Sequence, residues 1–167
     1  MPTSNPYPIG WIIEKVTEWN PRTILDVGVG FGKFGVLFRE YLETTVNEVY
    51  DKKDWKTKID ALEVWEKYIT PLHHFIYDNI IIEDARKFNR YQDYDLVFLG
   101  DILEHMTIEE GQKILDQIKG HYIVTTPTMF IKQGIVFGNP HEIHISEWKP
   151  EHFHNWEFIG RMTLGWK

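Results

Sequence analysis

The residues whose types and spacing most clearly suggest chemistry lie between positions 26 and 32. Asp26 is followed by glycines at alternate positions, Gly28, Gly30 and Gly32, at the end of the apolar run 23–27. Glycines permit a tight turn and let the backbone approach a ligand closely. Asp26 interrupts the apolar run, and a buried carboxylate without a partner is costly. The pattern predicts a nucleotide-binding turn in which Asp26 accepts hydrogen bonds from turn amides or from the ligand.

Acidic residues also stand at the ends of two later apolar runs. Glu63 lies at the end of the run 59–64, and Asp84, followed by the small Ala85, comes just after the run 80–82. A carboxylate at the end of a strand can accept hydrogen bonds from two ribose hydroxyls in a fixed geometry. Glu63 and Asp84 are therefore candidates for binding a nucleoside. The simpler alternative is that each is a solvated residue at a strand end.

A third set of residues combines carboxylates with imidazoles. Asp101, Glu104 and His105 are spaced at i, i+3 and i+4, so they share one face if the segment is helical. His144 follows in a later stretch that is rich in histidine. Glu104 and His105 are candidate general bases, and the four residues together could hold a divalent metal that acidifies a hydroxyl group. The alternative is that the histidines are surface residues or hydrogen-bonded loop residues.

The elements that must position these residues alternate along the chain. Helical spacing and capping signals predict helices over 9–19 and 33–43 and after the N-caps Thr70 and Thr107. Apolar runs predict strands over 23–27, 59–64, 80–82, 95–99 and 122–126. Because strands and helices alternate five times, we expect an α/β fold with a doubly wound, mostly parallel sheet and helices on both faces. An irregular functional loop over 128–150 and an antiparallel edge hairpin over 156–159 and 162–166 complete the prediction.

The composition is that of an ordinary globular chain of 167 residues, with 43% hydrophobic and 26% charged residues. With no cysteine, the chain has no disulfide, no thiolate nucleophile and no cysteine-based zinc site. The formal charge of −7 disfavours broad nucleic-acid binding, which needs a basic face. We expect a cytoplasmic protein without a membrane partner, because no apolar run approaches the ~18 residues of a membrane span and the N-terminus lacks a signal-peptide pattern.

A dinucleotide-binding fingerprint is the first alternative for the glycine-rich turn. Gly30, Gly32 and Gly35 fit the G-x-G-x-x-G pattern in one frame. That fingerprint places an acid ~20 residues further on, and Glu63 lies well past this distance. It also gives no role to Asp26. A small NAD-dependent oxidoreductase is therefore the less favoured interpretation.

Taken together, over about residues 9–127, the motifs resemble those of the class I S-adenosylmethionine-dependent methyltransferases. The first motif of that family, acid-x-G-x-G-x-G, matches the segment from Asp26 to Gly32. The resemblance implies that Glu63 binds the ribose of the cofactor, that Asp84 and Ala85 lie near its adenine, and that Asp101 also contacts it. Glu104 and His105 match the Glu-His that closes the fourth-strand segment in the family, which implies a catalytic role.

The chain is also similar to the small-RNA 2′-O-methyltransferases. Their fourth strand exits through Glu-x-x-Glu-His, and a later loop places a histidine four residues before a tryptophan. His144 and Trp148 match this spacing, whereas Asp101 replaces the first glutamate. This resemblance implies a divalent metal held by Asp101, Glu104, His105 and His144. Quinone- and small-molecule O-methyltransferases also carry Glu-His here, with a later loop that contains a histidine.

We therefore expect an S-adenosylmethionine-dependent methyltransferase whose acceptor is an oxygen of a small molecule. The alternatives are an RNA 2′-O-methyltransferase with a divalent metal, which the net charge disfavours, and a non-catalytic regulatory domain of the same fold. A homodimer is compatible with the sequence. The expected organisation is one domain over 1–167, with an N-terminal helix in 1–22, a cofactor-binding core over 23–127, and an acceptor-side loop and closing hairpin over 128–167.

Overall fold

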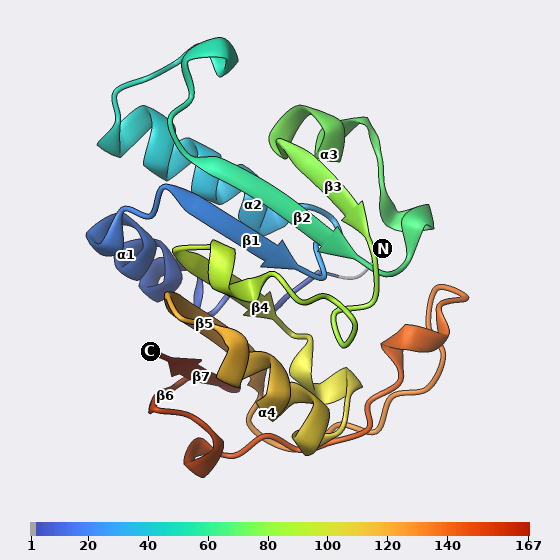
Figure 1. The fold of residues 1–167 in the computed structure, drawn as a ribbon. Coiled ribbons are helices and arrows are strands. Elements are labelled where there is room, and N and C mark those ends of the chain that lie inside the picture. The colour runs from blue at the N-terminus through green and yellow to red at the C-terminus, as the bar shows by residue number, and fades with distance from the viewer. Residues whose placement is uncertain (1–2) are drawn as a thin grey trace.

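A seven-stranded sheet forms the centre of the protein in a computed structural model that describes residues 3–167 (Figure 1). The strand order is β3-β2-β1-β4-β5-β7-β6. The strands are β1 (Thr23–Val27), β2 (Lys58–Glu63), β3 (Asn79–Ile82), β4 (Leu96–Gly100), β5 (His121–Pro127), β6 (Asn155–Ile159) and β7 (Met162–Trp166). Strands β1 to β5 pair in parallel, and the β6–β7 hairpin joins β5 in antiparallel pairing. The predicted fold class is therefore confirmed.

Helices cover both faces of the sheet and create two apolar cores. The helices are α1 (Ile9–Trp19), α2 (Lys33–Phe38), α3 (Pro71–Ile76) and α4 (Ile108–Gln117). The first three contribute to one core and α4 contributes to the other. Successive side chains of a strand point to opposite faces, so Ile24 of β1 packs in the first core and Leu25 in the second. A strand buried on both sides must be apolar at nearly every position, which explains the continuous run.

The second helix differs from its predicted extent of 33–43. Its α-helical part ends at Phe38, and the chain continues as a π-helix over Arg39–Val46. In this widened segment Arg39 and Glu43 are both buried and form an ion pair with a distance of 3.3 Å. The Arg39 guanidinium also donates hydrogen bonds to the carbonyls of Ile76 and Thr57, on two other segments. A helix predicted from the spacing of its apolar residues gives no place to buried charged side chains. The sequence pattern therefore could not show where the α-helix changes to a π-helix.

The carboxyl ends of the parallel strands meet at one end of the sheet. At the end of β1, Val27 lies beside Leu62 of β2 and Leu99 of β4. The long loop after β5, with short 3₁₀ turns at Pro140–Glu142 and Pro150–His152, lies near this end, toward which the arrowheads of β1 and β2 point (Figure 1). The segments that carry the predicted site residues are thereby brought together. Within residues 3–167, none of the helices has the length and apolarity needed to cross a bilayer.

Candidate functional site

A cavity of about 610 Å³ lies at the carboxyl ends of the parallel strands. This is the position at which doubly wound sheets bind their ligands, and the volume is in the usual range for a small-molecule site. Its walls include these predicted residues: Asp26, Gly28, Gly30, Glu63, Asp84, Ala85, Asp101, Glu104, His105 and His144. Gly32 does not line the cavity and instead caps the N-terminus of α2.

The glycine turn adopts a backbone that side chains disfavour. Gly28, Gly30 and Gly32 have φ angles of +72°, +51° and +85°, in the left-handed region where glycine carries no steric cost. At Gly28, a Cβ atom would lie 1.9 Å from Cδ1 of Ile102, a residue at the exit of β4. The turn is thus packed directly against the segment that leads to Glu104.

Asp26 lies buried beneath the turn, with 3% of its surface exposed. Its carboxylate accepts a 2.6 Å hydrogen bond from the hydroxyl of Tyr77, the residue that follows α3. Burial raises the pKa of Asp26 to about 7, and the hydrogen bond from Tyr77 opposes this rise. Asp26 therefore titrates in the physiological range, where a cationic ligand would favour its charged form.

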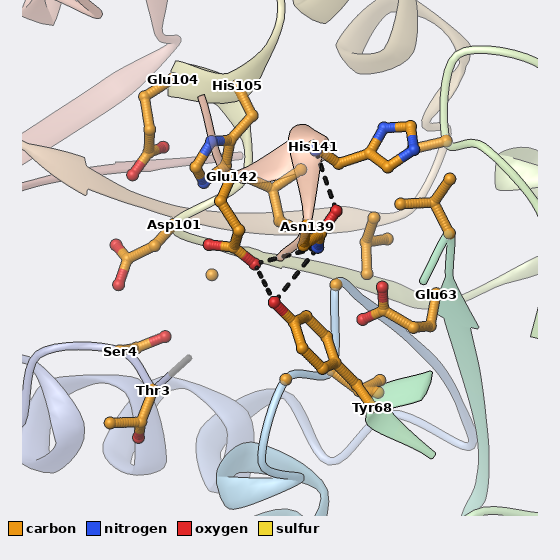
Figure 2. A pocket seen from close by; sticks show the side chains of 18 of the residues that line it. Thr3, Ser4, Glu63, Tyr68, Asp101, Glu104, His105, Asn139, His141 and Glu142 are labelled. Atoms are coloured by element: carbon orange, nitrogen blue, oxygen red, sulfur yellow. Dashed lines mark hydrogen bonds between the residues drawn. The ribbon is translucent and has the colours of Figure 1, made fainter. Parts of the chain in front are cut away.

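The two strand-end acids differ in their surroundings. Glu63 is buried in the wall of the cavity (Figure 2), where its carboxylate accepts a 2.8 Å hydrogen bond from the amide of Trp65. Burial raises the pKa of Glu63. Asp84 instead forms a 2.6 Å ion pair with Arg86, which lowers its pKa. Arg86, a cavity residue that the sequence patterns did not identify, therefore already binds the Asp84 carboxylate.

Three of the four predicted metal ligands come together at the exit of β4. One ligand atom each from Glu104, His105 and His144 lies within 4.8 Å of the other two. Glu104 is buried, and its Oε2 atom has no hydrogen-bond partner among residues 3–167. Burial and the nearby charge of Asp101 raise the pKa of Glu104 well above its usual range, and burial lowers the pKa of His105.

Asp101 lies outside this three-residue group. The expected helical face does not form, because Asp101 has a left-handed backbone with φ of +56° and only Leu103–His105 form a short 3₁₀ turn. The Asp101 carboxylate accepts a 3.0 Å hydrogen bond from the hydroxyl of Thr125. In Figure 2 its side chain lies between those of Glu104 and Ser4.

The loop after β5 holds His144 against the 3₁₀ turn. The indole N–H of Trp148 donates a 2.8 Å hydrogen bond to the carbonyl of Leu103, and the amide of Ile145 donates to the carbonyl of Glu104 at 2.7 Å. The Nδ1 atoms of His105 and His144 contact the carbonyls of Ile143 and Ile131 at 3.2 and 2.6 Å. A carbonyl oxygen can only accept, so both Nδ1 atoms carry the proton, and a neutral ring then keeps its lone pair on Nε2. This arrangement orients a histidine ligand or base.

Comparison with known proteins gives matches in structure only. No family model and no curated protein matches the sequence. The methyltransferase domain of a bacterial Hen1 protein (CtHen1-CN) superposes with a TM-score of 0.60 at 15% identity, covering 96% of both chains. The 1,6-didemethyltoxoflavin-N1-methyltransferase of Burkholderia thailandensis, solved with S-adenosylhomocysteine bound, superposes with a TM-score of 0.65 at 13% identity, covering 95% of this chain and 75% of that one. The protein has the fold of the class I methyltransferases.

Other structures of this methyltransferase fold match a smaller part of their own length. An O-methyltransferase family protein from B. thailandensis matches with a TM-score of 0.58 at 14% identity, over 93% of this chain and 54% of that chain. Three further matches, at TM-scores of 0.51 to 0.54, have only 36% to 58% of their length covered by this chain. The chain thus spans about a third to three fifths of the length of these four structures.

One polar cluster in the cavity was not predicted from the sequence. The Tyr68 hydroxyl donates a 2.9 Å hydrogen bond to the carboxylate of Glu142, and the Asn139 side-chain amide lies 3.3 Å from the same oxygen (Figure 2). All three side chains are buried, and burial raises the pKa of Tyr68 to about 12. The cluster ties the loop after β5 to the wall that carries Glu63. Asn139-Pro140 is a local turn signal in that loop.

The docking of this loop gives a first testable prediction. Trp148 is 1% exposed and fits over Gly111 of α4, where a Cβ atom would lie 2.3 Å from the indole ring. We expect Trp148→Ala to lower the free energy of unfolding by about 3–5 kcal/mol, the usual cost of truncating a buried tryptophan. Urea denaturation measures this loss. Trp156→Ala on β6, where the side chain is 47% exposed, is the matched control, and an equal loss in both variants would contradict the docking role.

Proposed function

We propose that the protein is a methyltransferase that uses S-adenosylmethionine. The observation that carries the proposal is that one cavity joins the glycine turn and Glu63 to the group formed by Glu104, His105 and His144. The first part suits a nucleoside with a cationic sulfur, because its ribose can donate to Glu63 and its positive charge is compatible with acidic walls. The group formed by Glu104, His105 and His144 is suited to accepting a proton from the methyl acceptor.

We further propose that the acceptor atom is an oxygen of a small molecule. Methyl transfer is a displacement at carbon, for which the protein supplies mainly alignment and exclusion of water. A hydroxyl acceptor must also lose its proton, and the Nε2 lone pair of His105 can receive it. Burial lowers the pKa of His105, which keeps the imidazole neutral and able to act as a base near neutral pH. The net charge of −7 weighs against the alternative of an RNA 2′-hydroxyl.

A divalent metal fits the residues present. The buried Glu104 oxygen without a partner is a ready ligand, and the fixed tautomers of His105 and His144 present nitrogen lone pairs of the kind that divalent transition metals prefer. These three residues would hold the ion, which would acidify a bound hydroxyl. Asp101 would stay with Thr125 unless the segment rearranges.

Titration calorimetry tests the cofactor. We expect S-adenosylmethionine and S-adenosylhomocysteine to bind, and NAD⁺ to show no heat of binding. Failure of both sulfur compounds to bind would contradict the proposal, and binding of NAD⁺ alone would favour an oxidoreductase. Binding of S-adenosylmethionine without methyl transfer to a broad panel of hydroxyl compounds would favour a regulatory domain.

Metal removal separately tests the proposed metal site of Glu104, His105 and His144. With a metal in the site, a chelator abolishes methyl transfer, and Mn²⁺ or Co²⁺ restores it. The same ions then raise the melting temperature of the wild type but not of His144→Ala, because only the folded site binds them. Transfer that is insensitive to chelation would contradict the metal and leave His105 as the base.

A further inference from the structure

Two side chains from the α3 segment reach the glycine turn from behind. His73 lies within α3 and Tyr77 immediately follows it. The Nε2 atom of His73 lies 3.1 Å from the carbonyl oxygen of Gly30, and the Tyr77 hydroxyl donates to Asp26 at 2.6 Å. Both side chains are buried, with 0% and 3% of their surface exposed. The two contacts join α3 to both parts of the predicted cofactor motif, its carboxylate and its glycines.

The hydrogen bonds of His73 define its protonation. Its Nδ1 atom accepts from the amide of Thr70 at 3.1 Å, in the capping box that starts α3. Because that nitrogen accepts, the proton of the neutral ring is on Nε2, which donates to the Gly30 carbonyl. Burial lowers the pKa of His73 and keeps this neutral form at physiological pH. His73 is therefore a fixed donor to the turn.

The later glycines of the motif make room for these two side chains. A Cβ atom on Gly35 would lie 2.5 Å from the Tyr77 hydroxyl oxygen, and one on Gly32 would lie 3.3 Å from Nε2 of His73. The first distance is far shorter than any real contact of a Cβ atom, and neither glycine lines the cavity. Gly32 and Gly35 thus serve the contact with α3, whereas Gly28 and Gly30 line the cavity.

We propose that His73 and Tyr77 are positioning residues for the cofactor, His73 by fixing the Gly30 carbonyl and Tyr77 by orienting the Asp26 carboxylate. This inference rests on the proposed function, because it assigns the two residues to the binding of S-adenosylmethionine. Neither residue needs to touch the cofactor. Each acts through a group of the turn, and together they make α3 the rigid support of the turn.

The pH dependence of binding distinguishes this role from simple packing. The charge of Asp26 is affected by burial, by the hydrogen bond from Tyr77 after α3, and by Glu63 at the end of β2. Burial raises the pKa of Asp26 to about 7, so the carboxyl group gains a proton as the pH falls through this value. If the cationic cofactor binds the ionised form, its affinity is full above the pKa and decreases below it, by up to about tenfold per pH unit.

The experiment is titration calorimetry with S-adenosylmethionine, which carries the sulfonium charge, in the absence of a methyl acceptor from about pH 5.5 to about pH 8.5. For the wild type we expect affinity to decrease toward low pH with a midpoint near 7. Tyr77→Phe removes only the hydroxyl that lowers the pKa of Asp26, so the midpoint should rise by about one pH unit, with affinity recovering at the alkaline end. A purely structural role would weaken binding at every pH without moving the midpoint.

His73 is tested by rescue. We expect His73→Leu to weaken binding about tenfold at every pH, the effect of losing one buried hydrogen bond, and His73→Gln, whose amide N–H can occupy the Nε2 position, to restore most of it. The exposed neighbour His74 provides the matched control, because His74→Leu should bind like the wild type. Wild-type affinity in His73→Leu, or an unmoved midpoint in Tyr77→Phe, would overturn the respective assignment. Lack of binding by the wild type would instead overturn the proposed function, and the inference with it.

Discussion

Glu104→Gln slows methyl transfer to a hydroxyl acceptor by on the order of 10²–10⁴-fold, the usual contribution of a positioned proton-transfer group, while S-adenosylhomocysteine binds as in the wild type. Glu104 is buried and lacks a partner for Oε2 among the described residues, and one of its carboxylate oxygens lies within 4.8 Å of a ring nitrogen of His105 and of His144. Glutamine keeps the size of glutamate but can neither release nor accept a proton, so it is a weaker metal ligand and cannot act as a base. The loss therefore appears in the transfer step and not in cofactor affinity.

Single-turnover measurement with radiolabelled S-adenosylmethionine, combined with calorimetry, separates the two steps. Glu147→Gln provides the matched control, because Glu147 lies on the same loop as His144 and is exposed. It should transfer methyl groups at the wild-type rate. A normal rate in Glu104→Gln would place the chemistry elsewhere in the cavity, and a loss of cofactor affinity equal to the loss of rate would make Glu104 a binding residue instead.

The central strands of the sheet could be predicted from the sequence because burial on both faces requires a continuous run of apolar residues. Ile24 and Leu25 face different cores, so β1 has to be apolar along its length, and the same holds for β4. The hairpin β6–β7 and the capping box of Thr107 with Glu110 are local patterns and were also found. The π-helix after Phe38 was not predicted, because it depends on contacts of Arg39 with distant segments.

In the candidate site, too, features that follow from local patterns could be predicted, and contacts between distant segments could not. Glu63 and Glu104 lie in one cavity because the carboxyl ends of parallel strands meet at the same edge of the sheet. The alternation of strands and helices in the sequence already implies this parallel arrangement. Tyr77 was not found, because it reaches Asp26 from 51 residues along the chain and no motif links the two. Tyr68 and Glu142 are likewise 74 residues apart. The left-handed backbone of Asp101, which breaks the expected helical face, was not predicted from the spacing of Asp101, Glu104 and His105.

Glu63→Gln is the variant with the largest expected effect on cofactor affinity. If both ribose hydroxyls donate to the Glu63 carboxylate, replacing it with a neutral amide should weaken the binding of S-adenosylhomocysteine by about 10- to 100-fold, the range for one hydrogen bond to a charged group. The variant keeps the side-chain oxygen that accepts from the amide of Trp65, so the strand end should stay in place. Burial raises the pKa of Glu63, so binding is measured at about pH 8, because a higher pH favours the ionised carboxyl group.

A cofactor analogue that lacks the ribose hydroxyls tests whether Glu63 contacts these hydroxyls directly. The wild type should lose as much affinity for 2′,3′-dideoxy-S-adenosylhomocysteine as Glu63→Gln loses for the natural compound. The two losses should not add in the variant, because each removes the same hydrogen bonds. Glu66→Gln, exposed and three residues further along the chain, is the matched control and should discriminate between the two compounds like the wild type. Additive losses would show that Glu63 and the ribose do not touch, and the cofactor would then have to lie in the cavity in another orientation.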